Sequence, residues 1–183
     1  MKQYDTIFLD RDGTLNPDPG YINSIDQFEF YDFTMDALKQ LGNAGHRFCI
    51  ITNQSGIGRG IVDINRLGEI HDFILNEFYN NNLNLLGIYF CPDHPDNASD
   101  FRKPGIGMFN QAASDHSIEL ANSIMIGDAV SDIEAGINSR MDTMLVLTGR
   151  GEDTQKKLGS ITPTFIVKDI MDGAQQILGE LAQ

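Results

Sequence analysis

The chain of 183 residues contains no tryptophan, only two cysteines and no long hydrophobic run. Two cysteines, Cys49 and Cys91, do not suggest a disulfide framework, and this composition fits a reducing cytoplasm. The apolar runs extend over about six residues at most, whereas a membrane-spanning helix needs about 20. Residues 1–5 lead directly into the first apolar run, so we expect no signal peptide.

Basic residues are scarce as well: 13 lysines and arginines stand against 26 aspartates and glutamates, which gives a formal net charge of −13. This charge argues against nucleic acid or an anionic membrane as partner, because both repel acidic surfaces. A negatively charged substrate would have to be held by a few local cations. The length and the 41% hydrophobic content predict a single globular domain over residues 1–183, and we expect a monomer.

Stretches typical of β-strands alternate with stretches typical of helices. Strands are expected at residues 6–9, 47–51, 86–90, 123–126, 143–147 and 165–167. Helices are expected at residues 34–44, 63–79, 108–116, 133–139 and 170–181. Thr34 and Asp63 are the expected N-caps of the first two helices. Strands separated by helices predict an α/β fold with a doubly wound parallel sheet.

Polar side chains gather where the apolar strands are expected to end. They are Asp10 and Asp12 after the first strand, Thr52 and Asn53 after the second, and Asp128 after the fourth. The carboxyl ends of parallel strands share one edge of the sheet. Residues far apart in the sequence are therefore expected to converge on one crevice.

Asp10 and Asp12 form the most informative pair. Carboxylates this close repel each other unless a cation neutralises one of them or a proton sits on the other. A divalent metal can share Asp10, and a protonated Asp12 can act as a general acid. The alternatives are an ordinary surface turn and a calcium loop, but the calcium pattern needs a glutamate at its twelfth position, which is Tyr21 here.

Two further segments carry groups suited to phosphate. Residues 52–60 contain hydroxyls, amides and glycines, and a loop of this kind exposes backbone N–H donors. Arg102 and Lys103 bring two adjacent cations into an otherwise acidic chain, and a guanidinium beside an ammonium suits a phosphoryl group. Each segment also has a plainer interpretation, as a glycine-rich turn and as a solvated basic turn.

The segment after the fourth strand repeats the strand-end aspartate. Asp128 is the candidate for a further carboxylate on the metal. Asp132 falls in the first turn of the next helix, where a negative charge is favoured. Asp132 is therefore either a helix cap or a residue that supports the metal site from behind the ligands.

Together, the four segments closely resemble the motifs of the haloacid dehalogenase-like (HAD) phosphatases over most of the chain. These motifs are Asp-x-Asp-Gly-Thr, a strand-end Thr, a Lys, and Gly-Asp-x-x-x-Asp, in this order. The resemblance implies a Mg²⁺-dependent phosphomonoesterase in which Asp10 attacks phosphorus and Asp12 serves as acid and then as base. It also implies that Asp10, the backbone carbonyl of Asp12 and Asp128 hold the metal. Thr52 and Lys103 would bind the phosphoryl oxygens.

A narrower resemblance points to the subfamily of D-glycero-D-manno-heptose 1,7-bisphosphate phosphatases and the related histidinol-phosphate phosphatases. It rests on residues 8–16, 20–22, 28–30, 52–60 and 101–104. It implies a domain without a large cap, a small phosphorylated sugar as substrate and a place in carbohydrate metabolism, in lipopolysaccharide precursor biosynthesis. The residues expected to contact the substrate are Asp18, Gly20, Tyr21, Asn53, Gln54, Ser55 and Arg102.

Two alternative functions remain. Histidinol phosphate is the alternative substrate. A non-catalytic phosphosugar-binding module on the same fold is the alternative of a different class, because a fold does not guarantee activity. Such a module would gain nothing from Asp12 as an acid.

The sequence departs from the subfamily at two places. Many members hold a structural zinc through a Cys-x-His pair and two further cysteines. Here Asp93 replaces that histidine and no later cysteine exists, so Cys91 and His94 cannot complete a tetrahedral site, and we expect no zinc. The second departure is Ala129, at a position where the family often has a cation, so one expected contact to a substrate phosphate is missing.

Overall fold

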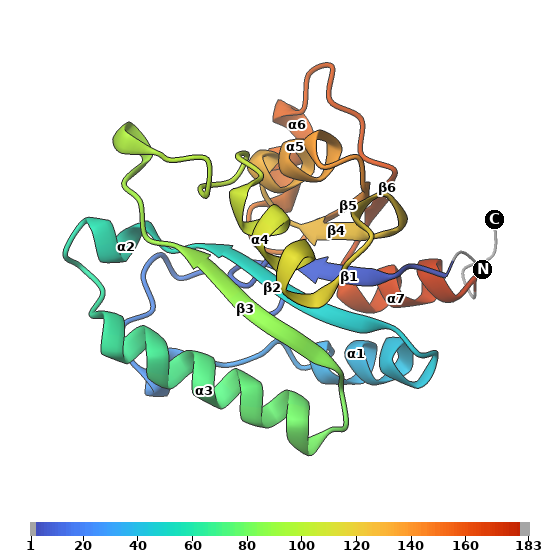
Figure 1. Ribbon diagram of the computed structural model, residues 1–183, viewed down its shortest axis with the longest axis horizontal. Coiled ribbons are helices and arrows are strands. Elements are labelled where there is room, and N and C mark those ends of the chain that lie inside the picture. Colours follow the sequence, from blue (N-terminus) through green and yellow to red (C-terminus); the bar gives the residue numbers. More distant parts are fainter. Residues whose placement is uncertain (1–2, 180–183) are drawn as a thin grey trace.

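The computed structural model describes residues 3–179, which form a six-stranded sheet between two layers of helices (Figure 1). The strands are β1 (Thr6–Leu9), β2 (Arg47–Asn53), β3 (Leu85–Cys91), β4 (Ile124–Gly127), β5 (Asp142–Val146) and β6 (Phe165–Val167). Their order in the sheet is β3-β2-β1-β4-β5-β6, and every neighbouring pair is parallel. The predicted doubly wound α/β fold is confirmed.

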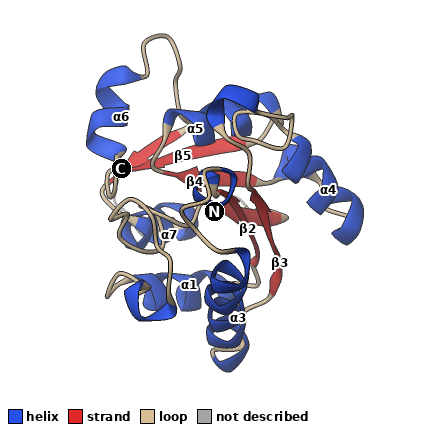
Figure 2. Cartoon of the chain, turned by 90° about the vertical axis from the view of Figure 1, so that its left-hand side faces the viewer, coloured by secondary structure: helices blue, strands red, loops and turns tan. Residues whose placement is uncertain are grey.

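The helices divide between the two faces of the sheet. One face is covered by α1 (Thr34–Asn43), α3 (Ile64–Asn80) and α7 (Ile170–Leu178). The other face is covered by α4 (Gly107–His116), α5 (Val130–Asn138) and α6 (Gly151–Lys157). Figure 2 shows the sheet from one end, with these two groups of helices on opposite sides. The short helix α2 (Ser55–Gly58) and the 3-10 turns η1 (Ile25–Gln27), η2 (Pro95–Asn97) and η3 (Leu120–Asn122) lie in the connections.

The apolar residues of β1 face both layers. Ile7 and Leu9 belong to the core under α1, α3 and α7, whereas Phe8 packs in the second core, where its ring lies 5.2 Å from that of Phe109 on α4. A strand buried on both faces needs an unbroken apolar run. This run fixes β1 at the centre of the sheet and thus fixes where its last residues end.

Several details of the helices differ from the expectations, and the short helix α2 was not expected. Thr34 is not an N-cap: it lies inside α1, and its hydroxyl donates to the carbonyl of Leu15 at 2.8 Å. The helix α6 was not expected, because its sequence has no apolar stripe. The helix α5 begins at Val130, earlier than predicted. Asp63 is confirmed as the cap of α3, and the predicted end of the last helix at residue 181 lies outside the described residues.

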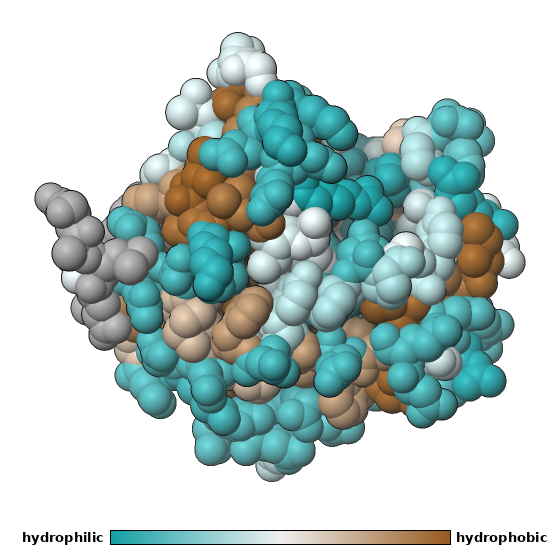
Figure 3. All heavy atoms as spheres, turned by 180° about the vertical axis from the view of Figure 1, so that it is seen from behind, coloured by the Kyte–Doolittle hydropathy of each residue, from teal (hydrophilic) through white to brown (hydrophobic). Residues whose placement is uncertain are grey.

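The surface seen in Figure 3 is mainly hydrophilic, with hydrophobic residues in separate patches. Among residues 3–179, no helix combines the length and the apolar character that crossing a membrane requires.

Candidate functional site

All the residues that the sequence suggested for catalysis, metal binding or substrate binding line one pocket of about 370 Å³. The strands β1 and β4 are neighbours at the point where the strand order reverses, and open α/β sheets bind ligands in the crevice at such a point. The predicted residues in the lining are Asp10, Asp12, Asp18, Gly20, Tyr21, Thr52, Asn53, Gln54, Ser55, Arg102, Lys103, Asp128 and Asp132. The lining also includes Gly56, Arg59, Pro95, Ala129, Ser131 and Arg150.

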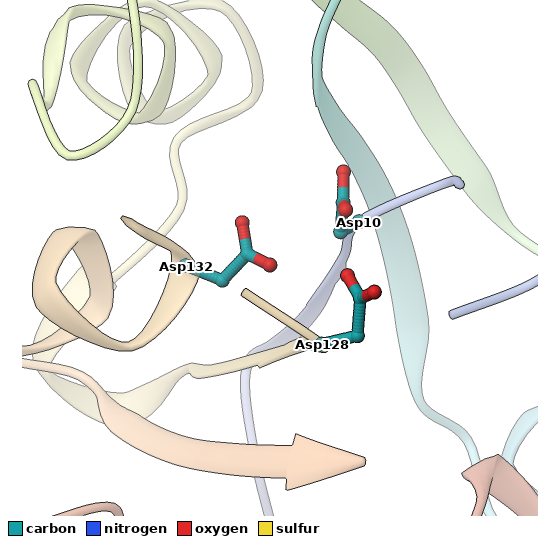
Figure 4. Close-up of side chains that lie close together, drawn as sticks. All are labelled: Asp10, Asp128 and Asp132. Atoms are coloured by element: carbon teal, nitrogen blue, oxygen red, sulfur yellow. The ribbon is translucent and has the colours of Figure 1, made fainter. Parts of the chain in front are cut away.

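Three buried aspartates converge at the base of the pocket (Figure 4). Asp10 follows β1, Asp128 follows β4, and Asp132 lies in the first turn of α5. One carboxylate oxygen from each residue lies within 4.8 Å of the other two. The side chain of Asp12 is not part of this group. Hard divalent cations such as Mg²⁺ prefer oxygen ligands of this kind.

Lys103 is the cation of this site and is itself buried. Its Nζ donates to Asp10 Oδ1 at 2.8 Å and to the carbonyl of Ile51 at 2.7 Å, and it lies 2.7 Å from Asp132 Oδ1. Burial lowers the pKa of Lys103, but the carboxylates of Asp10 and Asp132 outweigh burial and raise it above its usual value. Lys103 is therefore charged, and it holds the site together through two hydrogen bonds and the ion pair with Asp132.

The structure shows Asp132 as a helix cap, and its support of a metal site stays a prediction. Its Oδ2 accepts a hydrogen bond from the backbone N–H of Ala129 at 3.0 Å, which caps the start of α5, while its Oδ1 pairs with Lys103. The helix cap thus fixes the carboxylate that positions Lys103.

The negative charges of Asp10 and Asp128 are only partly neutralised by their surroundings. Burial raises the pKa of Asp10 to about 7, against the attraction of Lys103, and the Asp132 carboxylate raises it further. Burial also raises the pKa of Asp128 to about 8, and the neighbouring carboxylates of Asp10 and Asp132 add to this. One cation among three buried aspartates leaves an excess of negative charge at the base of the pocket.

Asp12 is held separately by a set of N–H donors. Arg11 is fully buried, and its Nε and Nη2 donate to Asp12 at distances of 2.8–3.0 Å. Asn16 donates to Asp12 Oδ1 and Gln54 donates to Asp12 Oδ2, each at 2.9 Å. These bonds fix the orientation of the Asp12 carboxylate at the pocket wall. Sequence reasoning did not select Arg11 because a charged residue between two strand-end aspartates gives no sign of its own burial.

The end of β2 and the residue after it are tied to their neighbours by the amide side chains of Asn53 and Gln54. Gln54 Nε2 donates to Thr52 Oγ1 at 3.0 Å, which leaves the hydroxyl hydrogen of Thr52 free to donate. The Asn53 side chain accepts from the backbone N–H of Lys103 at 3.0 Å and donates to its carbonyl at 3.1 Å. Asn53 thereby holds the segment that carries Lys103, and its contact with substrate stays a prediction.

Arg150 is a pocket residue that the sequence did not indicate. Its backbone N–H donates to Asp128 Oδ2 at 2.7 Å, and its guanidinium pairs with Asp18 Oδ2 at 2.9 Å. Asp18 Oδ1 in turn accepts from the backbone N–H of Gly20. A search for polar residues after the end of β5 would have drawn attention to this segment, because β5 ends at the same edge of the sheet.

The segment between β3 and Lys103 is organised by hydrogen bonds from side chains to the backbone. Asp93 Oδ2 accepts from the backbone N–H and the hydroxyl of Ser99. His94 Nδ1 accepts from the backbone N–H of Asp96 at 3.2 Å at the start of η2. Cys91 is buried at the end of β3.

Comparisons with known proteins identify the family to which this chain belongs. Residues 100–173 match the model of the HAD-hydrolase-like family. The D-glycero-beta-D-manno-heptose-1,7-bisphosphate 7-phosphatase of Photorhabdus laumondii is 35% identical over 181 residues, covering 94% of this chain and 95% of that protein. The enzyme of the same name from Haemophilus ducreyi is 42% identical over 154 residues. The match covers 79% of this chain and 84% of that protein.

A solved structure has the same fold over almost the whole length of both chains. The D,D-heptose 1,7-bisphosphate phosphatase from B. bronchiseptica, complexed with magnesium and phosphate, is 31% identical, with a TM-score of 0.88. The alignment covers 97% of this chain and 99% of that one. The chain therefore belongs to the D-glycero-D-manno-heptose 1,7-bisphosphate 7-phosphatase family of HAD-like phosphatases.

Proposed function

We propose that this protein is a Mg²⁺-dependent phosphomonoesterase that removes the C7 phosphate of D-glycero-β-D-manno-heptose 1,7-bisphosphate through an aspartyl-phosphate intermediate. The observation that carries the proposal is the convergence of Asp10, Lys103 and Asp128 at the base of one pocket. The position of the phosphate and the anomer follow the names of the relatives. We place the reaction in the cytoplasmic synthesis of lipopolysaccharide precursors.

The residues at the base of the pocket fit a divalent cation. Asp10 Oδ1 pairs with Lys103, and Asp128 Oδ2 accepts from Arg150, so each carboxylate has its second oxygen available. These two residues, with the backbone carbonyl of Asp12, would hold the metal. When bound, Mg²⁺ would neutralise negative charge on the transferring phosphoryl group.

In the covalent steps Asp10 is the nucleophile, and Asp12 is first the general acid and then the general base. An oxygen of Asp10 attacks phosphorus, the bond from phosphorus to the C7 oxygen breaks, and Asp12, protonated in the substrate complex, transfers its proton to that oxygen. Asp12, now ionised, takes a proton from water as the water attacks the aspartyl phosphate. Inorganic phosphate leaves, Asp10 is regenerated as a carboxylate, and Asp12 is again protonated.

Three arginines favour a substrate with a second phosphate. Arg59, Arg102 and Arg150 all line the pocket of a chain whose net charge is −13. Only one Arg150 nitrogen is used by Asp18, so other N–H groups of its fork can bind an anion. In the proposal, this arginine cluster binds the second phosphate in place of the cation that is absent at Ala129. A monophosphate such as histidinol phosphate has no group for it.

A substrate panel tests the proposal directly. Phosphate release is measured with Mg²⁺ for the heptose 1,7-bisphosphate, other phosphorylated sugars and histidinol phosphate. We expect the highest kcat/KM for the heptose bisphosphate, with loss of the C7 phosphate detected by ³¹P NMR. Faster turnover of histidinol phosphate would reject the proposed substrate, and no release from any member of the panel would favour a binding module.

The same panel tests the arginine cluster through Arg150→Gln. Loss of one charged contact to the C1 phosphate is expected to lower kcat/KM for the bisphosphate about 10- to 100-fold, mainly through KM. The loss for heptose 7-phosphate should be clearly smaller, because that compound lacks the C1 phosphate. Lys156→Gln, on the exposed end of α6, is the control with the same change in charge. Equal losses for both substrates would contradict the role of Arg150.

The raised pKa values predict that the metal-free protein loses stability as the pH rises from 6 to 9. Folded Asp10 and Asp128 take up protons below about pH 7 and about pH 8, whereas unfolded aspartates do so only near 3.8. Protonation therefore favours the folded state at low pH; this contribution declines as the pH rises above about 3.8, is still partly present at pH 6 and is fully lost above about pH 8. We expect MgCl₂ to raise the melting temperature more at pH 9 than at pH 6.

Asp128→Asn provides the control for this pH dependence. It removes one of the two groups that titrate in this range, so its melting temperature should vary less between pH 6 and pH 9. An unchanged pH profile in Asp128→Asn would show that other groups cause the effect.

A further inference from the structure

The carboxylate of Asp128 lies in a narrow slot formed by two loops. Its Oδ2 accepts from the backbone N–H of Arg150, in the loop after β5. Gly13, after β1, and Gly149 have φ values of +85° and +56°, which favour glycine. A Cβ on Gly13 or Gly149 would lie only 2.1 or 2.3 Å from Asp128 Oδ2. Both glycines are therefore needed for the backbone to approach this oxygen so closely.

One side chain connects the two walls of the slot. Thr148 Oγ1 donates to the carbonyl of Gly13 at 2.6 Å, a contact between residues 135 positions apart in the sequence. This bond joins the loop after β5 to the loop after β1, with Asp128 between them. It fixes the separation of Gly13 and Gly149 and keeps the N–H of Arg150 in place.

This arrangement determines which oxygen of Asp128 is available for the metal. Oδ2 is enclosed by the two glycines and the Arg150 amide, and the carboxylate is directed towards Asp10 (Figure 4). We propose that Thr148 is a positioning residue for the Mg²⁺ site, because it holds the slot that orients Asp128. The inference rests on the magnesium site of the proposed function. It extends the site to a loop outside the four motif segments.

Mg²⁺ binding by Thr148→Val and Thr148→Ser tests the proposal. Valine keeps the shape of the side chain but removes the hydroxyl, whereas serine keeps the hydroxyl. The melting temperature of each protein is measured against MgCl₂ concentration, without substrate, and a dissociation constant is derived. Loss of one hydrogen bond that preorganises the site should weaken Mg²⁺ binding about five- to tenfold in Thr148→Val. Thr148→Ser should bind within about twofold of the wild type, because its hydroxyl makes the same kind of bond.

Thr162→Val, in the exposed connection between α6 and β6, is the matched control and should bind Mg²⁺ like the wild type. A purely structural role for Thr148 would lower the melting temperature of Thr148→Val without changing its dissociation constant, and that result would overturn the proposal. If Mg²⁺ binding were weakened equally in Thr148→Ser and Thr148→Val, that result would overturn the proposal as well.

If the wild type itself failed to bind Mg²⁺, both the proposed metal site and this inference would be rejected. Wild-type binding with no activity on the heptose bisphosphate would reject the proposed substrate alone.

Discussion

Replacing Asp10 by asparagine is expected to lower phosphate release by about four orders of magnitude or more, because removal of a nucleophile costs this much in enzymes with covalent intermediates. An amide in place of the carboxylate cannot form the aspartyl phosphate. The measurement is kcat on the heptose bisphosphate with saturating Mg²⁺. The intermediate can be trapped with acid in the wild type and should be absent from Asp10→Asn.

The structure predicts that Asp10→Asn remains folded, so the loss can be assigned to chemistry. Asparagine has nearly the same shape, and its Oδ1 can accept the hydrogen bond from Lys103. It also removes one of three buried, mutually repelling carboxylates. The melting temperature at pH 8 without metal should therefore not fall. Asp72→Asn, on the exposed side of α3, is the control with the same change in charge, and retained turnover in Asp10→Asn would exclude Asp10 as the nucleophile.

The centre of the site could be predicted from the sequence because each of its parts has a local signal. Asp10, Thr52 and Asp128 each end an apolar strand, and parallel strands with intervening helices end at a common edge. The convergence of these residues follows from two facts that a sequence displays directly: where apolar runs stop and which polar residues follow.

The position of Arg150 after the end of β5 gives a local signal, but the contacts of the outer parts of the site could not be predicted because they depend on pairing over long distances. Arg150 pairs with Asp18 across 132 positions, and Thr148 donates to Gly13 across 135. No periodicity or spacing marks such partners, and the loop that carries Thr148 and Arg150 has no apolar pattern. Arg11 is a similar case, since its burial depends on three-dimensional packing around Asp12.

The second large effect is expected for Asp12→Asn. Loss of the general acid and base should lower kcat for an alkyl phosphate such as the heptose bisphosphate about 10²- to 10⁴-fold. The substitution also disrupts the hydrogen bonds around residue 12. Every contact that the Asp12 carboxylate makes with Arg11, Asn16 and Gln54 is with an N–H donor. The asparagine amide would present a donor to one of these donors. We therefore expect a lower melting temperature as well, and activity must be compared below the onset of unfolding.

The leaving group separates the loss of acid catalysis from the structural effect. The alkoxide of a sugar must be protonated as the bond to phosphorus breaks, whereas the phenolate of p-nitrophenyl phosphate is a far weaker base and can leave without a proton. In single-turnover measurements, phosphorylation of Asp10 by p-nitrophenyl phosphate should be slowed much less by Asp12→Asn than phosphorylation by the heptose bisphosphate. A distorted site would slow both reactions alike.

The second step tests the role of Asp12 as a base. Hydrolysis of the aspartyl phosphate should be slow whichever substrate formed it, because Asp12→Asn lacks the base that activates water. The phosphoenzyme should therefore accumulate. Equal slowing of the first step with no accumulated phosphoenzyme would show that Asp12 acts through its structural contacts with Arg11 and Gln54, and not as the acid and base.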